Sequence, residues 1–145
     1  MQLKNLMDEN FQDYKKTSMM LATCICDWKC LKEQNLNISI CQNSELAKQP
    51  TIEVSIESII NRYLNNPITN AVVIGGLEPI LQFDEILQFI KCFRLKCEDD
   101  IVIYTGYYPD EIEDKITQLK QYKNIIIKFG RYIHEETKMF DKVLG

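Results

Sequence analysis

The residues with the clearest chemical potential are three cysteines near the start of the chain. Cys26, Cys30 and Cys41 lie within sixteen positions of each other, and thiolates are soft ligands that suit zinc, copper(I) or an iron–sulfur cluster. A structural zinc ion takes four protein ligands. The fourth would have to be Cys24, because the single histidine, His134, is far along the chain and no Cys-x-x-Cys pair is present. Three thiolates suit a four-iron cluster whose fourth iron stays open to an external ligand.

The alternative is that these cysteines are unrelated free thiols. The chain has six cysteines and no secretory signal, which predicts a cytoplasmic, reducing location where disulfides are rare. A cysteine in such a protein is often a small buried hydrophobe. We interpret Cys92 and Cys97 in this way because they fall in or beside a predicted helix, and we favour the same interpretation for Cys24.

The composition limits the class of protein. The 145 residues are 46% apolar, which predicts one folded domain over residues 1–145. The net charge is −4, from 17 Lys and Arg against 21 Asp and Glu. This weak acidity argues against binding to nucleic acid or to an anionic membrane surface. No apolar run reaches the roughly 20 residues that span a bilayer, so neither nucleic acid nor membrane is an expected partner.

The elements that must position the cysteines alternate along the chain. Continuous apolar runs predict buried strands over residues 18–24, 70–74, 101–104 and 124–129. Amphipathic patterns between them predict helices from the N-cap Ser55 to Leu64, over residues 84–95, and from Pro109 onward.

This alternation indicates right-handed βαβ units. The predicted fold is α/β, a partial (β/α) barrel with a short parallel sheet of about four strands flanked by helices. Residues 1–17 are expected to form an arm or a short helix. Residues 25–50 are expected to form a long cysteine loop without regular structure.

The unusual residues of the chain follow the strands. Cys26 and Cys30 come after the first strand, Gly75-Gly-Leu-Glu78 after the second, Thr105-Gly106 after the third and Gly130-Arg131 after the fourth. Parallel α/β folds bind ligands at this edge of the sheet. The two glycines make either a simple tight turn or a close backbone approach to a ligand, with Glu78 offering a carboxylate to a cation. Trp28 is either a buried anchor or a partly exposed neighbour of a cofactor.

Five motifs in this order carry a family resemblance: Cys26-x3-Cys30, Ile40-Cys41-Gln-Asn43-Ser-Glu45, Gly75-Gly-Leu-Glu78-Pro79, Tyr104-Thr-Gly-Tyr107 and Gly130-Arg131-Tyr132. The chain resembles the radical S-adenosylmethionine proteins from Ser18 onward, and in particular the activating proteins of anaerobic (class III) ribonucleotide reductase. The resemblance implies a [4Fe–4S] cluster on Cys26, Cys30 and Cys41. It implies that S-adenosylmethionine is bound by Gly75, Gly76, Glu78, Asn43 and Thr105.

The resemblance also implies a reaction, with no catalytic side chain assigned. The open iron chelates the amino and carboxylate groups of S-adenosylmethionine, and a flavodoxin or ferredoxin supplies an electron. Cleavage gives methionine and a 5′-deoxyadenosyl radical, which takes a hydrogen atom from a glycine of the large reductase subunit. Four strands cannot close a barrel, so the open side is where this protein substrate is expected to dock.

Three departures from the family pattern leave alternatives open. Ten residues separate Cys30 from Cys41, where the family signature has two, so Cys24 competes for the third ligand position. Leu77 interrupts the Gly-Gly-Glu segment. Relatives continue beyond the position of Gly145, so either the chain is truncated or that segment is dispensable. The alternatives are a degenerate cluster- or zinc-binding relative without radical chemistry, and a plain α/β interaction module with free thiols.

Overall fold

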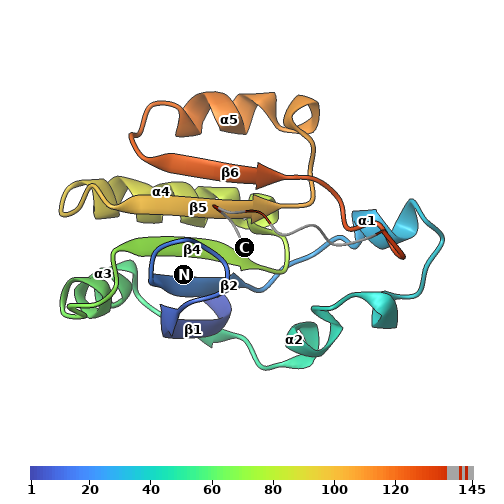
Figure 1. The fold of residues 1–145 in the computed structure, drawn as a ribbon, viewed down its shortest axis with the longest axis horizontal. Helices are drawn as coiled ribbons and strands as arrows, with labels where there is room; N and C mark the ends of the chain where they lie inside the picture. The colour runs from blue at the N-terminus through green and yellow to red at the C-terminus, as the bar shows by residue number, and fades with distance from the viewer. Residues whose placement is uncertain (137–140, 142, 144–145) are drawn as a thin grey trace.

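A single six-stranded sheet organises the protein, in the order β3-β1-β2-β4-β5-β6 (Figure 1). The computed structural model describes residues 1–136, Asp141 and Val143, so the chain end at Gly145 lies outside the described residues. The strands are β1 (Gln2–Asn10), β2 (Ser18–Thr23), β3 (Ile52–Glu53), β4 (Ala71–Gly76), β5 (Asp100–Thr105) and β6 (Ile125–Phe129). Neighbours from β2 to β6 are parallel, whereas β1 is antiparallel to β2 and to β3. The predicted α/β fold with four parallel strands is confirmed.

Three helices cover one face of the sheet: α3 (Ile56–Leu64), α4 (Phe83–Arg94) and α5 (Glu113–Leu119). The parallel strands lie side by side in chain order, so each right-handed crossover places its helix on the same face, as in part of a barrel. One large core cluster lies between these helices and the sheet, and its largest fully buried side chains include Phe89, Phe93, Met19, Leu21 and Ile103. No helix within the described residues is long and apolar enough to cross a membrane.

The helix ends follow from local sequence signals. Ser55 is the predicted N-cap of α3, and its hydroxyl accepts the Ser58 N–H at 3.1 Å. The helix expected from Pro109 is divided: a 3₁₀ turn, η3 (Pro109–Glu111), comes first, and Ile112 at φ −138° separates it from α5. A second 3₁₀ turn, η2 (Pro79–Gln82), leads into α4.

The first seventeen residues differ from the expected arm or short helix, because Gln2–Asn10 form strand β1. Leu3 is fully buried on the helix side, while Asn5 and Met7 line the cleft described below. Strand β1 also has register irregularities against β2. A strand whose second face borders a cleft carries polar residues there, so its sequence shows neither a continuous apolar run nor a clean alternation.

The cysteine loop is more structured than the sequence predicts. It contains α1 (Lys29–Lys32), the 3₁₀ turn η1 (Ile38–Ile40) and α2 (Ser44–Lys48). Each is at most five residues long, which is too short for a helical repeat of apolar residues to be visible. Figure 1 shows these turns beyond the arrowheads of β4, β5 and β6, at the carboxyl edge of the sheet.

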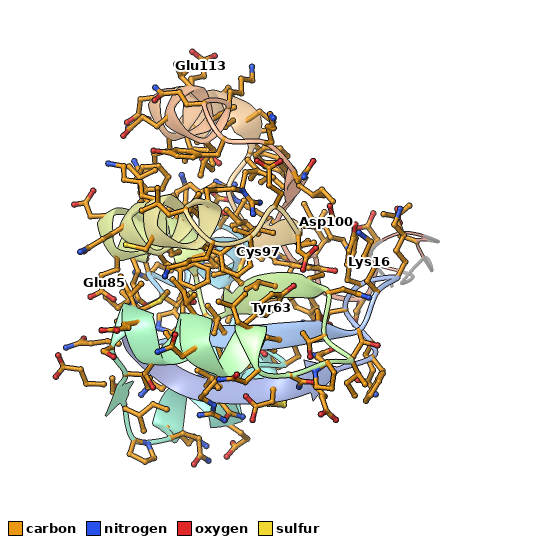
Figure 2. The ribbon with its side chains drawn as sticks, turned by 90° about the vertical axis from the view of Figure 1, so that its left-hand side faces the viewer. Lys16, Tyr63, Glu85, Cys97, Asp100 and Glu113 are labelled. Atoms are coloured by element: carbon orange, nitrogen blue, oxygen red, sulfur yellow. The ribbon has the colours of Figure 1, made fainter. Side chains whose placement is uncertain are left out.

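The other face of the sheet carries no helix within the described residues. Its buried residues are Ala71, Val73 and Val102, and Tyr14 from the segment after β1 packs on them. The Tyr14 hydroxyl donates to Asp100 Oδ2 at 2.7 Å, and Lys16 Nζ lies 2.6 Å from the same oxygen. Figure 2 shows Lys16 and Asp100 together on the side of the sheet away from α4.

The contacts of Tyr14 and Lys16 with Asp100 predict that the stability of the fold depends on pH. Burial acts to raise the pKa of Asp100, but hydrogen bonds from Lys16 and Tyr14 outweigh it, so the pKa lies below its ordinary value. A carboxyl group with a depressed folded-state pKa contributes stability above its unfolded pKa of about 3.9, and this is lost as the pH falls through the folded-state value. We expect Asp100→Asn to unfold at lower urea concentration than the wild type at pH 7, with the difference narrowing below about pH 4. Urea unfolding over a pH series measures this, and a difference that persists unchanged to low pH would contradict it.

Candidate cluster and cofactor site

A cleft of about 680 Å³ lies at the carboxyl edge of the sheet, between the cysteine loop and the ends of β4, β5 and β6. It extends over the helix-free face as far as Gln12 and Asp13. All eight residues that the sequence predicts as cluster or cofactor ligands line it, namely Cys26, Cys30, Cys41, Asn43, Gly75, Gly76, Glu78 and Thr105. Cys24 does not line it, and the Cys24 N–H donates to Gln82 Oε1 at 2.6 Å instead.

The first cysteine, Cys26, lies in a tight turn after β2. Its Sγ accepts the N–H of Trp28 at 3.3 Å, and Trp28 has a left-handed backbone at φ 59°. Asp27 Oδ1 accepts the Lys29 N–H at 3.1 Å, and Asp27 Oδ2 accepts the hydroxyl proton of Tyr107 at 2.8 Å. The turn is therefore attached to the chain that follows β5. Trp28 lines the cleft and is partly exposed.

The second cysteine, Cys30, belongs to α1. Its carbonyl oxygen accepts a hydrogen bond from Gln34 Nε2 at 2.7 Å. The same amide nitrogen donates to the Tyr132 carbonyl at 2.8 Å, and Gln34 Oε1 accepts the His134 N–H at 2.9 Å. One glutamine side chain thus joins α1 to the segment after β6, which runs beside α1 in Figure 1.

The third cysteine, Cys41, lies at the cleft after the ten-residue segment that contains the insertion. Asn43 fixes its position, because the Asn43 N–H donates to Cys41 Sγ at 3.4 Å while Asn43 Nδ2 donates to the Gly76 carbonyl at 2.6 Å. The insertion is therefore anchored near its start by Gln34 and just after its end by Asn43. A closed loop of this length costs little more free energy than a shorter one.

Burial and neighbouring charges raise the pKa values of two of the cleft thiols. Burial raises the pKa of Cys26 to about 11, and the charges of Cys30 and Asp27 add to the shift. Burial also raises the pKa of Cys30, with Cys41 the next contributor. No group of three or more His, Cys, Asp or Glu side chains within the described residues is arranged around one metal ion. A four-iron cluster places each thiolate on a different iron, and the three cysteines that line the cleft are the donor type that such a cluster takes.

Gly75 and Gly76 are the last residues of β4 rather than a free turn. Their neighbours in β2 are Ala22 and Thr23. Gly76 has φ +86°, and a Cβ there would lie 2.9 Å from both Cα and Cβ of Ala22. The Thr23 hydroxyl donates to the Gly75 carbonyl at 2.9 Å. The glycines therefore let two strands meet closely at the floor of the cleft.

Glu78 connects the ends of β4 and β5. Its side chain is only 6% exposed. Oε1 accepts the Ile80 N–H at 3.0 Å and the Thr105 hydroxyl at 2.8 Å, and Oε2 accepts the Gly106 N–H at 2.8 Å. Burial raises the pKa of the carboxyl group although these hydrogen bonds oppose the shift. The carboxylate thus already accepts three hydrogen bonds inside the protein, and its contact with a cofactor cation stays a prediction.

Sequence reasoning missed the side chains that hold the cysteine loop in place. Gln34 and Asp27 have no sequence signal, because each looks like an ordinary polar loop residue. Arg131 is visible beside Gly130 at the end of a strand, but its acidic partners, Glu33 and Glu111, are far from it in the chain.

Comparison with known proteins agrees with the donor set. Residues 16–143 match the family model described as the 4Fe-4S single cluster domain. No curated protein and no solved structure matches the chain. The match covers nearly the whole chain and includes every cleft cysteine, so the protein belongs to the 4Fe-4S single cluster domain family.

Proposed function

We propose that this protein is a radical S-adenosylmethionine activase that generates a glycyl radical on an anaerobic ribonucleoside-triphosphate reductase. The observation that carries the proposal is that one cleft is lined both by the three cysteines and by the Gly75–Glu78 segment. The proposed cluster ligands and the proposed cofactor-binding segment thus line the same cleft. Membership of a 4Fe-4S single cluster family supports the cluster assignment.

The residues that line the cleft have different proposed roles. Cys26, Cys30 and Cys41 would hold a [4Fe–4S] cluster, and three protein ligands leave one iron for S-adenosylmethionine. A cluster bound there would supply the electron for reductive cleavage of S-adenosylmethionine. Gly76 is partly exposed and presents its backbone on the cleft floor, where the methionine part of the cofactor would lie, and the buried Gly75 precedes it.

The partners follow from the same proposal. A flavodoxin or ferredoxin is the proposed electron donor, and the large reductase subunit is the proposed protein substrate. The cleft opens onto the helix-free face between β1 and β6, where Asn5, Met7 and Lys128 form part of its lining. This open face gives a large substrate access to the cofactor.

A second candidate function is a cluster-binding relative without radical chemistry. The observation that favours it is the engagement of Glu78, whose two carboxylate oxygens accept hydrogen bonds from Ile80, Thr105 and Gly106. A carboxylate held in this way has less capacity to receive the amino group of a cofactor. Leu77 adds one residue between Gly76 and Glu78 and shifts this register.

Anaerobic reduction of the iron-loaded protein with S-adenosylmethionine tests the proposal. We expect release of 5′-deoxyadenosine and methionine, detected by chromatography, and its loss in Cys30→Ala. Cys92→Ala is the matched control, because Cys92 packs against the helix-side core and not in the cleft. Release by Cys30→Ala at the wild-type rate would refute the proposal. A loaded wild-type protein that releases none would instead establish the second candidate.

The target is tested separately. Addition of the reductase subunit to the active protein should give the electron paramagnetic resonance signal of a glycyl radical. Release of 5′-deoxyadenosine without that signal would mean that the substrate is a different protein.

A further inference from the structure

Four charged side chains on the outer wall of the cleft form a network that the proposed reaction does not use. Arg131, which follows β6, lies at its centre. Nη1 donates to the Gly106 carbonyl at 3.0 Å and to Glu111 Oε2 at 2.7 Å. Nη2 donates to Glu111 Oε1 at 2.6 Å and to Glu33 Oε1 at 2.9 Å, and Nε donates to Glu33 Oε2. Lys29 also donates to Glu111.

The network is more than a set of surface ion pairs. Exposed pairs contribute little to stability, because water and salt screen them. The Arg131 side chain is only 7% exposed, however, and it forms a two-bond fork with each carboxylate. The Arg131 Cζ atom also lies over the Tyr108 ring, 4.7 Å from its centre. A guanidinium held at this many points has a fixed position, which a lysine could not reproduce.

The anchored residues bracket one of the cleft cysteines. Lys29 immediately precedes Cys30, and Glu33 lies three residues after it, just beyond the end of α1. Both side chains are held by the same pair, Arg131 and Glu111. Helix α1 has only four residues and is too short to be stable alone. Its orientation must therefore come from contacts such as these.

We propose that Arg131 is a positioning residue that fixes α1 so that Cys30 faces the cleft. The inference rests on the proposed cluster site for its purpose, but the contact itself belongs to the protein without a cluster. Arg131 joins three chain segments through these contacts: the end of α1 at Glu33, the residues after β5 at Gly106, and η3 at Glu111. Loss of the fork loosens α1 and the direction of the Cys30 side chain, while the Gln34 hydrogen bond to the Cys30 carbonyl and the core beneath the sheet remain.

Hydrogen exchange of the metal-free protein tests the contact directly. The amides of Leu31 and Glu33 donate to the carbonyls of Trp28 and Lys29 inside α1, and we expect Arg131→Gln to accelerate their exchange about tenfold. Glu33→Gln removes one fork from the exposed side and should give a smaller increase. Arg62→Gln is the matched control, because Arg62 makes the same kind of fork to Asp8, which lies on β1 away from the cleft. It should leave α1 exchange unchanged.

The iron-loaded protein gives the second readout. We expect Arg131→Gln to change the electron paramagnetic resonance spectrum and the midpoint potential of the cluster, with partial rescue in Arg131→Lys and no change in Arg62→Gln. Unchanged α1 exchange in both Arg131→Gln and Glu33→Gln would overturn the inference, and so would faster exchange with an unaltered cluster spectrum. Failure of the proposed function is separate, since it would show as intact Cys30→Ala activity with the exchange result standing.

Discussion

Replacement of Cys41 by alanine is expected to reduce the iron content of the reconstituted protein from about four atoms per chain to nearly none. Two thiolates hold a four-iron cluster poorly, and no other cysteine within the described residues lines the cleft. The expected loss of 5′-deoxyadenosine release is complete. Iron and sulfide analysis with the visible absorption spectrum measures the effect.

Cys24→Ala is the matched control, because Cys24 is the nearest alternative in the sequence but is not among the residues that line the cleft. It should retain its iron and its brown colour. The opposite pattern, with iron lost in Cys24→Ala and kept in Cys41→Ala, would assign the third ligand to Cys24. That result would also mean that the insertion before Cys41 does not return to the cluster.

Gly76→Ala is expected to destabilise the protein by about 3 kcal/mol. A left-handed backbone costs an alanine about 1–2 kcal/mol, and overpacking in a tight interior typically costs about 1–3 kcal/mol more. The new methyl group would lie 2.9 Å from the Ala22 Cα, and Ala22 is itself buried in β2. Urea unfolding of the metal-free protein measures the change in the free energy of unfolding.

Gly130→Ala separates the cost of the left-handed backbone from the cost of the steric clash. Gly130 also has a positive φ, of +124°, but a Cβ there would meet nothing within 4 Å. This variant carries conformational strain without a clash, in a position after β6 where the chain can adjust. Equal destabilisation by the two substitutions would show that the close approach of β4 to β2 is not the reason for glycine at position 76.

The sequence predicts the parallel part of the fold because each of those strands is a continuous apolar run. Strands β2, β4 and β5 are mostly buried, and β6 at the sheet edge is half-buried throughout. Strand β4 is an example: Ala71 to Ile74 are completely buried and form an uninterrupted apolar run. Strand β1 escapes prediction because one face of it borders the cleft. The short turns of the cysteine loop escape because side-chain contacts, not apolar periodicity, stabilise them.

The composition of the cleft was also predictable, since parallel strands end at one edge and bring their following residues together. The contacts that arrange these residues were not predictable. Asn43 and Gly76 are 33 positions apart, and Gln34 and Tyr132 are 98 apart. The hydrogen bonds from Thr105 and Gly106 to Glu78 were not predictable either. A motif shows that a carboxylate is present but not which donors already hydrogen-bond to it.

Gln34 and Asn43 hold the two ends of the segment between Cys30 and Cys41. The number of residues in that segment therefore does not determine how far apart the two cysteines lie in the cleft. Once Cys30 and Cys41 are each fixed by their own neighbours, the residues between them form an excursion whose length is free to vary. The shorter cysteine spacing of the radical S-adenosylmethionine proteins that the chain resembles is then one connection among several that would bring three such thiols to one cleft. Engineered chains with longer excursions are expected to keep the proposed cluster site, provided that an amide at the position of Asn43 still reaches the strand beneath it.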